Sequence, residues 1–223
     1  MFNVVRDIEA PECLSRKIYN DASVVKALEE IFYGKCYLCE QDELSDAEIE
    51  HFIPHGSVDE LKYKWENLFL SCSRCNNIKS DSHLNLLDCS DESVSVFEEI
   101  IHLAGNCSSG VIDIRVAKEN PGEKALNTAA LLNECFNSSN TGLRKISKES
   151  LMEKLQGEFF YYMSYRMQLV DKRSSSEVIQ NAKNKLKPMC RVSYPFSAFW
   201  RWHILTDQKI IKFFPNIRAE LEF

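Results

Sequence analysis

Apolar side chains recur at helical spacing along residues 21–33 and leave the positions between them polar. This spacing predicts an amphipathic helix. Asp21 or Ser23 can cap its first turn, and Gly34 is suited to end it. The apolar face would consist of Val24, Val25, Leu28, Ile31 and Phe32.

Short extended patterns follow and are interrupted by turn residues. Residues 47–53 alternate enough to predict a short strand with Ile49 on one face, and His51 and Ile53 fall on the same face. Pro-His-Gly then turns the chain. We expect a loop or short strand at 65–70, and a turn that enters a helix at 72–82.

The second part of the chain is predicted to be mostly helical. We expect helices at 94–104, 121–132, 143–170, 176–186 and 195–205, and a strand of β-branched residues at 110–117. We place a soft domain boundary near residue 90, where the cysteine-rich part ends.

Composition narrows the class of protein. Of the 223 residues, 44% are apolar and 27% are charged, which is ordinary for a soluble globular protein. No apolar run approaches the ~18 residues of a membrane-spanning helix. Residues 1–10 carry Arg6, Asp7 and Glu9 without a long apolar stretch, so we expect no signal peptide and a cytoplasmic location.

The net charge of -6 conceals an asymmetry. Residues 1–140 contain 12 Lys and Arg against 25 Asp and Glu, whereas residues 141–212 contain 14 against 6. A basic C-terminal part suggests contact with a polyanion or with an acidic surface. A long, solvated, lysine-rich helix would give the same count, so the charge leaves both interpretations open.

Nine cysteines in a chain without an export signal favour metal binding over a disulfide framework. Two Cys-x-x-Cys pairs occur, Cys36/Cys39 and Cys72/Cys75. Four thiolates at this spacing can complete a closed tetrahedral site of the kind that holds structural zinc. The alternatives, buried free thiols or a redox pair, fit two matched pairs less well. The remaining cysteines, expected to be small core residues, are Cys13, Cys89, Cys107, Cys135 and Cys190.

Polar residues in a distinctive order lie between and after the cysteine pairs. Glu50 and His51 stand at the end of the predicted strand, and Asn67 follows within Trp-Glu-Asn-Leu. Asn76 directly follows the second cysteine pair, and Lys79 lies three residues later on the same helical turn. A carboxylate, an imidazole and two carboxamides are thus expected around a zinc-stapled hairpin and helix.

This order resembles the signature of the HNH endonuclease family over roughly residues 33–82. The matching segments are Glu50-His51-x-x-Pro54, Asn67-Leu68 and Cys72-x-x-Cys75-Asn76-x-x-Lys79. The resemblance implies that two strands and a helix pinch a catalytic divalent metal. The expected fold class is therefore α+β, with a zinc-stapled ββα-metal (HNH) nuclease core in residues 1–90. Residues 91–223 would form a mostly helical C-terminal region for contact with a partner and nucleic acid.

The resemblance implies a role for each matching residue. His51 would be the general base that deprotonates water, and Glu50 a metal ligand where the family usually has Asp. Asn67 would orient the loop between the strands, and Asn76 would be the second metal ligand. Because Glu is one methylene longer than Asp, the metal position can shift.

Three further residues are candidates for contact with nucleic acid. Lys79 would contact phosphate or structure the helix, and His55 and His83 could each touch phosphate or metal. As single histidines, His55 and His83 also fit ordinary surface positions.

Phosphodiester hydrolysis requires an activated water, neutralisation of the phosphate and help for the leaving oxygen. A histidine with an unperturbed pKa of about 6.5 is mostly neutral at physiological pH and can act as a base. The oxygens of Glu50 and Asn76 suit Mg²⁺ or Mn²⁺ better than zinc. We therefore expect structural Zn²⁺ on sulfur and catalytic Mg²⁺, or Mn²⁺, on oxygen.

A narrower resemblance is to PtuB, the HNH nuclease subunit of Septu-type anti-phage defence systems, which also occurs beside retrons. It rests on overall length and on Arg6, Pro11 and residues 32–40, 50–52 and 75–79. It implies a bacterial toxic effector controlled by an ABC/SMC-like ATPase, PtuA. A retron reverse transcriptase and its DNA–RNA product are further candidate partners.

The C-terminal part is rich in aromatic and basic side chains. Aromatic rings favour interfaces and stacking on bases, and basic residues can follow a phosphate backbone. The rings equally fit an ordinary helical core. The aromatic residues are Phe159, Phe160, Tyr161, Tyr162, Tyr165, Tyr194, Phe196, Phe199, Trp200 and Trp202, and the basic ones are Arg166, Lys172, Arg173, Lys183, Lys185, Lys187, Arg191 and Arg201.

Two other functions stay open at the level of sequence. One is a zinc-stapled nucleic-acid-binding module without catalysis, against which the intact His51 and its neighbours count. The other is an adaptor subunit whose work is to bind an ATPase. The sequence also does not separate DNA, the family default, from RNA such as tRNA.

Overall fold

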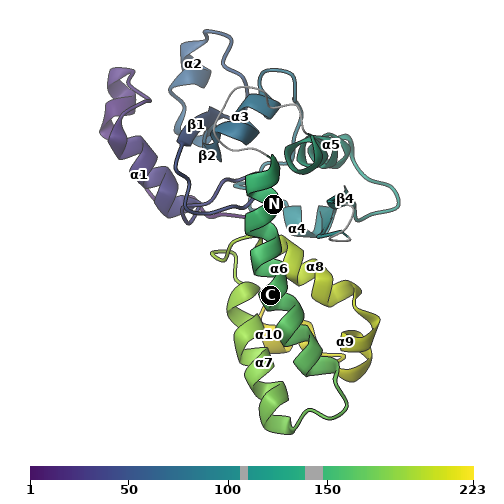
Figure 1. Cartoon of the computed structure of the whole chain (residues 1–223). Coiled ribbons are helices and arrows are strands. Elements are labelled where there is room, and N and C mark those ends of the chain that lie inside the picture. Colours follow the sequence, from purple (N-terminus) through teal and green to yellow (C-terminus); the bar gives the residue numbers. More distant parts are fainter. Residues whose placement is uncertain (106–109, 139–147) are drawn as a thin grey trace.

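The computed structural model describes residues 1–105, 110–138 and 148–223. It confirms the mixed α+β class: two small antiparallel sheets lie in the N-terminal part, and helices dominate the C-terminal part (Figure 1). Within these ranges, no helix is long and apolar enough to cross a membrane.

Among the described residues, helices and strands alternate in the N-terminal part, and every element from α5 onward is a helix. The strands are β1 (Ala47–His51), β2 (Leu68–Cys72), β3 (Ile100–Leu103) and β4 (Asp113–Val116), and two 3-10 turns, η1 and η2, cover Glu12–Arg16 and Trp65–Asn67. The helices are α1 (Ala22–Ile31), α2 (Asp59–Lys62), α3 (Ser73–Lys79), α4 (Val96–Glu99), α5 (Glu123–Asn137), α6 (Lys148–Val170), α7 (Ser176–Met189), α8 (Ser197–Thr206), α9 (Gln208–Phe213) and α10 (Ile217–Leu221).

The first sheet pairs β1 with β2 in antiparallel register, with Ala47 opposite Cys72 and His51 opposite Leu68. Every residue of β2 is buried, and α3 begins directly after this strand. The chain therefore forms a two-stranded sheet followed by a helix, and α3 packs against both strands.

Helix α1 forms where the apolar spacing predicted it. The Asp21 side chain accepts a hydrogen bond from the backbone N–H of Ser23, which caps the first turn. Gly34, just beyond the helix, has a φ of 66°, a left-handed conformation that glycine adopts without a Cβ penalty. Buried Val24, Leu28 and Ile31 pack the helix on the core and on β2.

The predicted helix at 94–104 is wrong in its second half. One helical turn, α4, is followed by strand β3, which pairs with β4 so that Ile100 lies opposite Val116. Burial alternates along β3, with Ile100 and His102 facing the interior. The helical pattern of this segment is weak, and its two adjacent isoleucines are β-branched residues that favour a strand. Pairing with β4 therefore decides for the strand.

Several boundaries also differ from the predicted ones. The strand predicted at 47–53 ends at His51, and the strand predicted at 110–117 shortens to Asp113–Val116. Helix α6 accounts for 148–170 of the predicted 143–170, and residues 143–147 lie outside the described residues, as does Cys107.

The C-terminal helices enclose an aromatic core. Helix α6 packs against α7 and α9 (Figure 1). Helix α8 packs against β3. Tyr162 and Trp200 are buried and stack with ring centroids 5.7 Å apart, and Phe199 is also fully buried. In contrast, Phe160 and Tyr161 are 73% and 53% exposed. Most of the predicted aromatic cluster therefore belongs to the core of the helical region.

Many of the basic side chains of this region form contacts within the chain. Arg166 pairs with Asp207, and Lys187 with Glu222. Lys183 also forms an ion pair, and Arg201 donates to a backbone carbonyl. Part of the positive charge counted in the sequence is thus neutralised by neighbouring helices.

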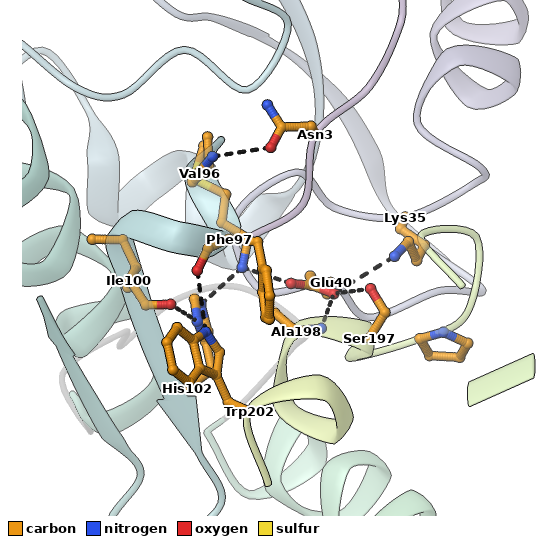
Figure 2. A network of polar contacts seen from close by, with 12 residues as sticks. Asn3, Lys35, Glu40, Val96, Phe97, Ile100, His102, Ser197, Ala198 and Trp202 are labelled. Atoms are coloured by element: carbon orange, nitrogen blue, oxygen red, sulfur yellow. Dashed lines mark hydrogen bonds and ion pairs between the residues drawn. The ribbon is translucent and has the colours of Figure 1, made fainter. Parts of the chain in front are cut away.

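A buried polar network joins the segment that follows Cys36 and Cys39 to the C-terminal helices (Figure 2). One Glu40 oxygen lies 2.6 Å from the Met1 amine, which contacts His102 Nε2 at 2.8 Å. The other Glu40 oxygen accepts from Ser197 Oγ at 3.0 Å. Although burial opposes the charge, the Met1 amine and Lys35 hold the pKa of Glu40 well below its ordinary value. Buried contacts therefore cross residue 90, and the boundary there stays a prediction.

Candidate active site and metal centre

The four predicted zinc ligands lie together. Cys36 and Cys39 come from the loop after α1, Cys72 ends β2, and Cys75 lies on α3. Their Sγ atoms are all within 4.8 Å of one another, and all four residues are buried. The backbone N–H of Tyr37 donates to the carbonyl of Leu70 on β2 at 2.9 Å, which holds the first Cys-x-x-Cys pair beside the second.

The geometry of this cluster fits zinc. Sulfurs about 2.3 Å from a tetrahedral ion are about 3.8 Å apart, and the Sγ atoms of Cys39 and Cys72 are 3.9 Å apart. The backbone N–H of Cys75 points at Cys72 Sγ at 3.4 Å, a contact that stabilises a thiolate. Within the described ranges, no other set of three or more His, Cys, Asp or Glu side chains is gathered closely enough to hold an ion.

Helix α3 faces β1 so that two pairs of polar side chains meet. Glu48 and Glu50 are two residues apart on β1 and therefore share a face, and Asn76 and Lys79 are one turn apart on α3. Asn76 Nδ2 donates to Glu48 Oε2 at 2.5 Å, and Lys79 Nζ donates to Glu50 Oε1 at 2.6 Å. The periods of strand and helix set this arrangement once α3 packs on the sheet.

Glu50 is a buried carboxylate held by a buried ammonium. It is 6% exposed, and burial raises its pKa to about 7, an effect that Lys79 only partly offsets. Lys79 is fully buried, and its Nζ also donates to the carbonyl oxygen of His51 at 2.9 Å. Lys79 is therefore the counter-ion of Glu50, and its predicted contact with phosphate would require this ion pair to open.

His51 is held in one tautomer by the backbone. Its Nε2 lies 2.9 Å from the carbonyl oxygen of Lys62, and a carbonyl can only accept, so Nε2 carries the hydrogen. The lone pair of the neutral ring is then on Nδ1. Burial lowers the pKa of His51, which keeps the ring neutral near pH 7. The Tyr19 and His55 rings pack edge-on against it, with centroids 4.9 and 4.6 Å away.

Asn67 ties together the two ends of the loop between β1 and β2. Its Oδ1 accepts from the N–H of Ile53 at 2.7 Å, and its Nδ2 donates to the carbonyls of Ile53 and Leu61 at 2.8 and 2.9 Å. The same loop carries Lys62, whose carbonyl holds His51. Asn67 therefore hydrogen-bonds within this loop, and its role in a catalytic site stays a prediction.

The two remaining histidine candidates differ in their surroundings. His55 lies against His51, and its Nδ1 accepts from the N–H of Ser57 at 3.0 Å. His83 lies beyond the end of α3, with Nε2 3.5 Å from a carboxylate oxygen of Glu134 on α5. Their contact with nucleic acid stays a prediction, and the structure brings only His55 to the His51 ring.

Sequence reasoning missed two residues that shape this site. Glu48 binds Asn76, and Lys62 offers its carbonyl to His51. Strand alternation could have found Glu48, since it lies two positions before Glu50 in a predicted strand. No sequence signal marks the Lys62 carbonyl, because any residue type supplies one.

The oxygen donors of the site fit a hard divalent cation. Glu50 on β1 supplies a carboxylate, and Asn76 on α3 supplies an amide carbonyl. Mg²⁺ is usually bound by one or two carboxylates while keeping several waters or substrate phosphates as further ligands. A site with few protein ligands therefore suits Mg²⁺ or Mn²⁺, whereas the sulfur cluster suits zinc.

A family model described as HNH endonuclease matches residues 36–82. The matched segment begins at the first cysteine of the cluster, includes β1 and β2, and ends just past α3. The chain carries an HNH endonuclease domain. In this HNH domain, the strands and α3 hold His51, Glu50 and Asn76, and the four cysteines lie at the base of α3 and in the first knuckle.

The chain is also distantly homologous to Septu protein PtuB. It is 26% identical to Septu protein PtuB of Bacillus mycoides (strain KBAB4) in an alignment 167 residues long, and this alignment covers 62% of this chain and 55% of that protein. It is 41% identical to Septu protein PtuB of Bacillus thuringiensis over 56 residues, 24% of this chain and 22% of that protein. The match thus spans about half the length of the first relative and less of the second. No solved structure matches the chain.

Proposed function

We propose that this protein is a metal-dependent endonuclease that hydrolyses phosphodiester bonds of nucleic acid. The observation that carries the proposal is the tautomer of His51 inside the HNH domain. The Lys62 carbonyl fixes the hydrogen on Nε2, so the lone pair of Nδ1 can accept a proton. Burial lowers the pKa of His51, so its ring is neutral near pH 7 and can accept a proton from water, as a general base in phosphodiester hydrolysis must.

In this mechanism Nδ1 of His51 takes the proton from the attacking water. The hydrogen bond from Nε2 to the Lys62 carbonyl fixes the ring plane and steadies the imidazolium that forms. Asn67 acts indirectly, because its three hydrogen bonds hold the loop that presents this carbonyl. Loss of Asn67 would therefore misplace the base without removing it.

Glu50 and Asn76 would hold the catalytic cation through a carboxylate and an amide oxygen. When bound, Mg²⁺ or Mn²⁺ supplies Lewis acidity that neutralises the phosphate and the leaving oxygen. Before that, the ion pair with Lys79 holds Glu50 in place and favours its ionised form, which burial opposes. The Lys79 ammonium then remains as positive charge behind the site.

The similarity to Septu protein PtuB supports a role in anti-phage defence. We propose that the nuclease is the toxic effector of a complex with an ABC/SMC-like ATPase that restrains or licenses it. A retron reverse transcriptase with its DNA–RNA product is a further candidate partner. The substrate is DNA or RNA, tRNA included.

A side-by-side cleavage assay tests the enzyme. Wild type and His51→Ala are incubated with Mg²⁺ on labelled duplex DNA and on total small RNA, alone and with the ATPase. Removal of a general base is expected to slow cleavage by about 10²–10⁴-fold, and the substrate that disappears distinguishes DNA from RNA. Glu29→Ala, which removes an exposed carboxylate on α1, is the matched control.

Zinc content and thermal stability show whether His51→Ala is folded. If a folded His51→Ala cleaves as fast as wild type, His51 is not the base. If wild type with the ATPase and either metal cleaves neither substrate, the chain acts as a binding or adaptor subunit.

A further inference from the structure

Strand β1 contributes to the site a carboxylate, that of Glu48, which the family signature does not include. Glu48 lies two residues before Glu50, on the same face of β1. Its Oε2 accepts the amide hydrogen of Asn76 at 2.5 Å, and Asn76 is the proposed cation ligand on α3. Glu48 is therefore hydrogen-bonded to the proposed cation ligand Asn76.

The chemistry of this hydrogen bond decides how the Asn76 amide is turned. An ionised carboxylate has acceptor oxygens and no hydrogen to donate, so only the NH₂ group of an amide can face it. With Nδ2 fixed toward Glu48, the carbonyl oxygen Oδ1 is directed elsewhere. A flipped amide would place two oxygens about 2.5 Å apart, which is repulsive.

We propose that Glu48 is a positioning residue that holds Oδ1 of Asn76 toward the catalytic cation. This inference rests on the proposed function, because it assigns a purpose to the amide orientation at the same site. A hard cation is bound by the amide oxygen and repelled by the amide hydrogens, so only one of the two flip states binds it. Glu48 selects that state before the cation arrives and keeps it without consuming a ligand position.

The pair on the next turn of α3 follows the same logic. Lys79 holds Glu50, and Glu48 holds Asn76, so each proposed ligand has one partner on the opposite element. Partners behind metal ligands orient them and are worth about 10–100-fold in metal affinity. The sheet and helix thus provide both the ligands and the groups that aim them.

Binding of Mn²⁺ tests this role without relying on activity. Zinc-loaded wild type, Glu48→Ala and Glu48→Gln are titrated with Mn²⁺, and free Mn²⁺ is followed by electron paramagnetic resonance. We expect Glu48→Ala to weaken Mn²⁺ binding by about 10-fold. Glu48→Gln keeps an oxygen that accepts the Asn76 hydrogen and should weaken binding far less. Glu29→Ala is the control for loss of one carboxylate elsewhere.

Each result has a distinct meaning. Near-wild-type binding by Glu48→Ala, with binding lost in Asn76→Ala, overturns the positioning role and leaves the proposed function standing. Equal losses in Glu48→Ala and Glu48→Gln also overturn it, because they show that the charge itself is needed and Glu48 coordinates the ion. If wild type binds no Mn²⁺ at all, both this inference and the metal site of the proposed function fail.

Discussion

Residues 36–82 and residues 148–223 bury different kinds of side chain. The HNH domain buries charged and polar groups within its small core, including Glu50, Lys79, Asn67 and Arg74. The helical region buries aromatic and aliphatic groups and forms ion pairs such as Lys187 with Glu222 at its surface. Burying charged groups in the HNH domain costs desolvation free energy. Burying apolar groups in the helical region stabilises the fold.

This difference separates the segment that contains the candidate active site from the helical segment. A two-stranded sheet and a seven-residue helix offer little apolar surface, and the buried four-cysteine cluster beside them fits a zinc site that would stabilise so small a core. The helical region has an aromatic core around Trp200 and Tyr162, which can stabilise it without a metal site. The buried pair of Glu50 and Lys79 belongs to the candidate site, whereas the buried charges of Glu40 and Lys35 lie in the network of Figure 2.

Loss of zinc should have the largest effect, and it should unfold the HNH domain while leaving the helical region folded. Cys72→Ser removes one of four ligands, and structural zinc contributes about 10–16 kcal/mol of apparent binding free energy, so we expect the HNH domain to unfold. Limited proteolysis with mass mapping should then show cuts within 36–82 before cuts within 148–223. Elemental analysis should give one zinc per chain for wild type and for Cys13→Ser, whose thiol lies outside the cluster. An intact protease pattern in zinc-free protein would contradict the staple.

Removal of Lys79 should have the next largest effect. Lys79→Met leaves the Glu50 carboxylate buried without a counter-ion, and loss of one partner of a buried ion pair typically lowers the free energy of unfolding by about 3–5 kcal/mol. Denaturant unfolding of the zinc-loaded protein measures this. The double variant Lys79→Met with Glu50→Gln should recover part of the loss, since no charge is then left unpaired. A double variant as unstable as the single one would show that packing of the Lys79 stem matters more.

Acidification should destabilise the helical region through His203. Its Nε2 accepts from the N–H of Ala104 at 3.0 Å, and burial lowers its pKa to about 4. The unfolded chain, with a histidine pKa of about 6.5, binds the proton first, so stability is present above pH 6.5 and is lost as the pH falls toward 4. We expect a loss of about 2 kcal/mol between pH 7 and pH 5 from this group. His203→Gln keeps an acceptor and does not titrate, so its denaturant midpoint should fall less over this range; an equal fall would exclude His203 as the cause.

Surface ion pairs should have the smallest effect. Lys187→Ala removes the pair with Glu222 between α7 and α10, and exposed pairs contribute below about 1 kcal/mol. Thermal unfolding at low and high salt measures the difference. A loss comparable to that of Lys79→Met would mean that charge stabilises the helical region as much as the HNH domain.

Local patterns in the sequence were sufficient for much of the HNH domain. The two Cys-x-x-Cys pairs predicted a four-sulfur site, and the structure gathers the same four cysteines. Helix α1 follows from its apolar spacing and the Asp21 cap. These features depend on residues close in sequence or on a fixed ligand set, so no long-range information is needed to find them.

The sequence did not determine features that depend on which segments pair. Residues 100–103 form a strand because β4 supplies hydrogen-bond partners, and a lone segment does not reveal them. The aromatic residues near 160 and 200 were consistent with a core or an interface, and packing of α6 on α8 decided that Tyr162 and Trp200 are core while Phe160 is exposed.

By itself the sequence predicted the four-cysteine cluster and the α+β class, which the structure confirms. Its resemblance to the HNH endonuclease family named the candidate base and cation ligands. Only the tertiary structure decided how those side chains are charged and aimed. Lys79 pairs with Glu50, Glu48 turns Asn76, and a backbone carbonyl selects the tautomer of His51. Protonation and orientation depend on burial and on partners brought from another element, and these exist only after α3 has packed against β1.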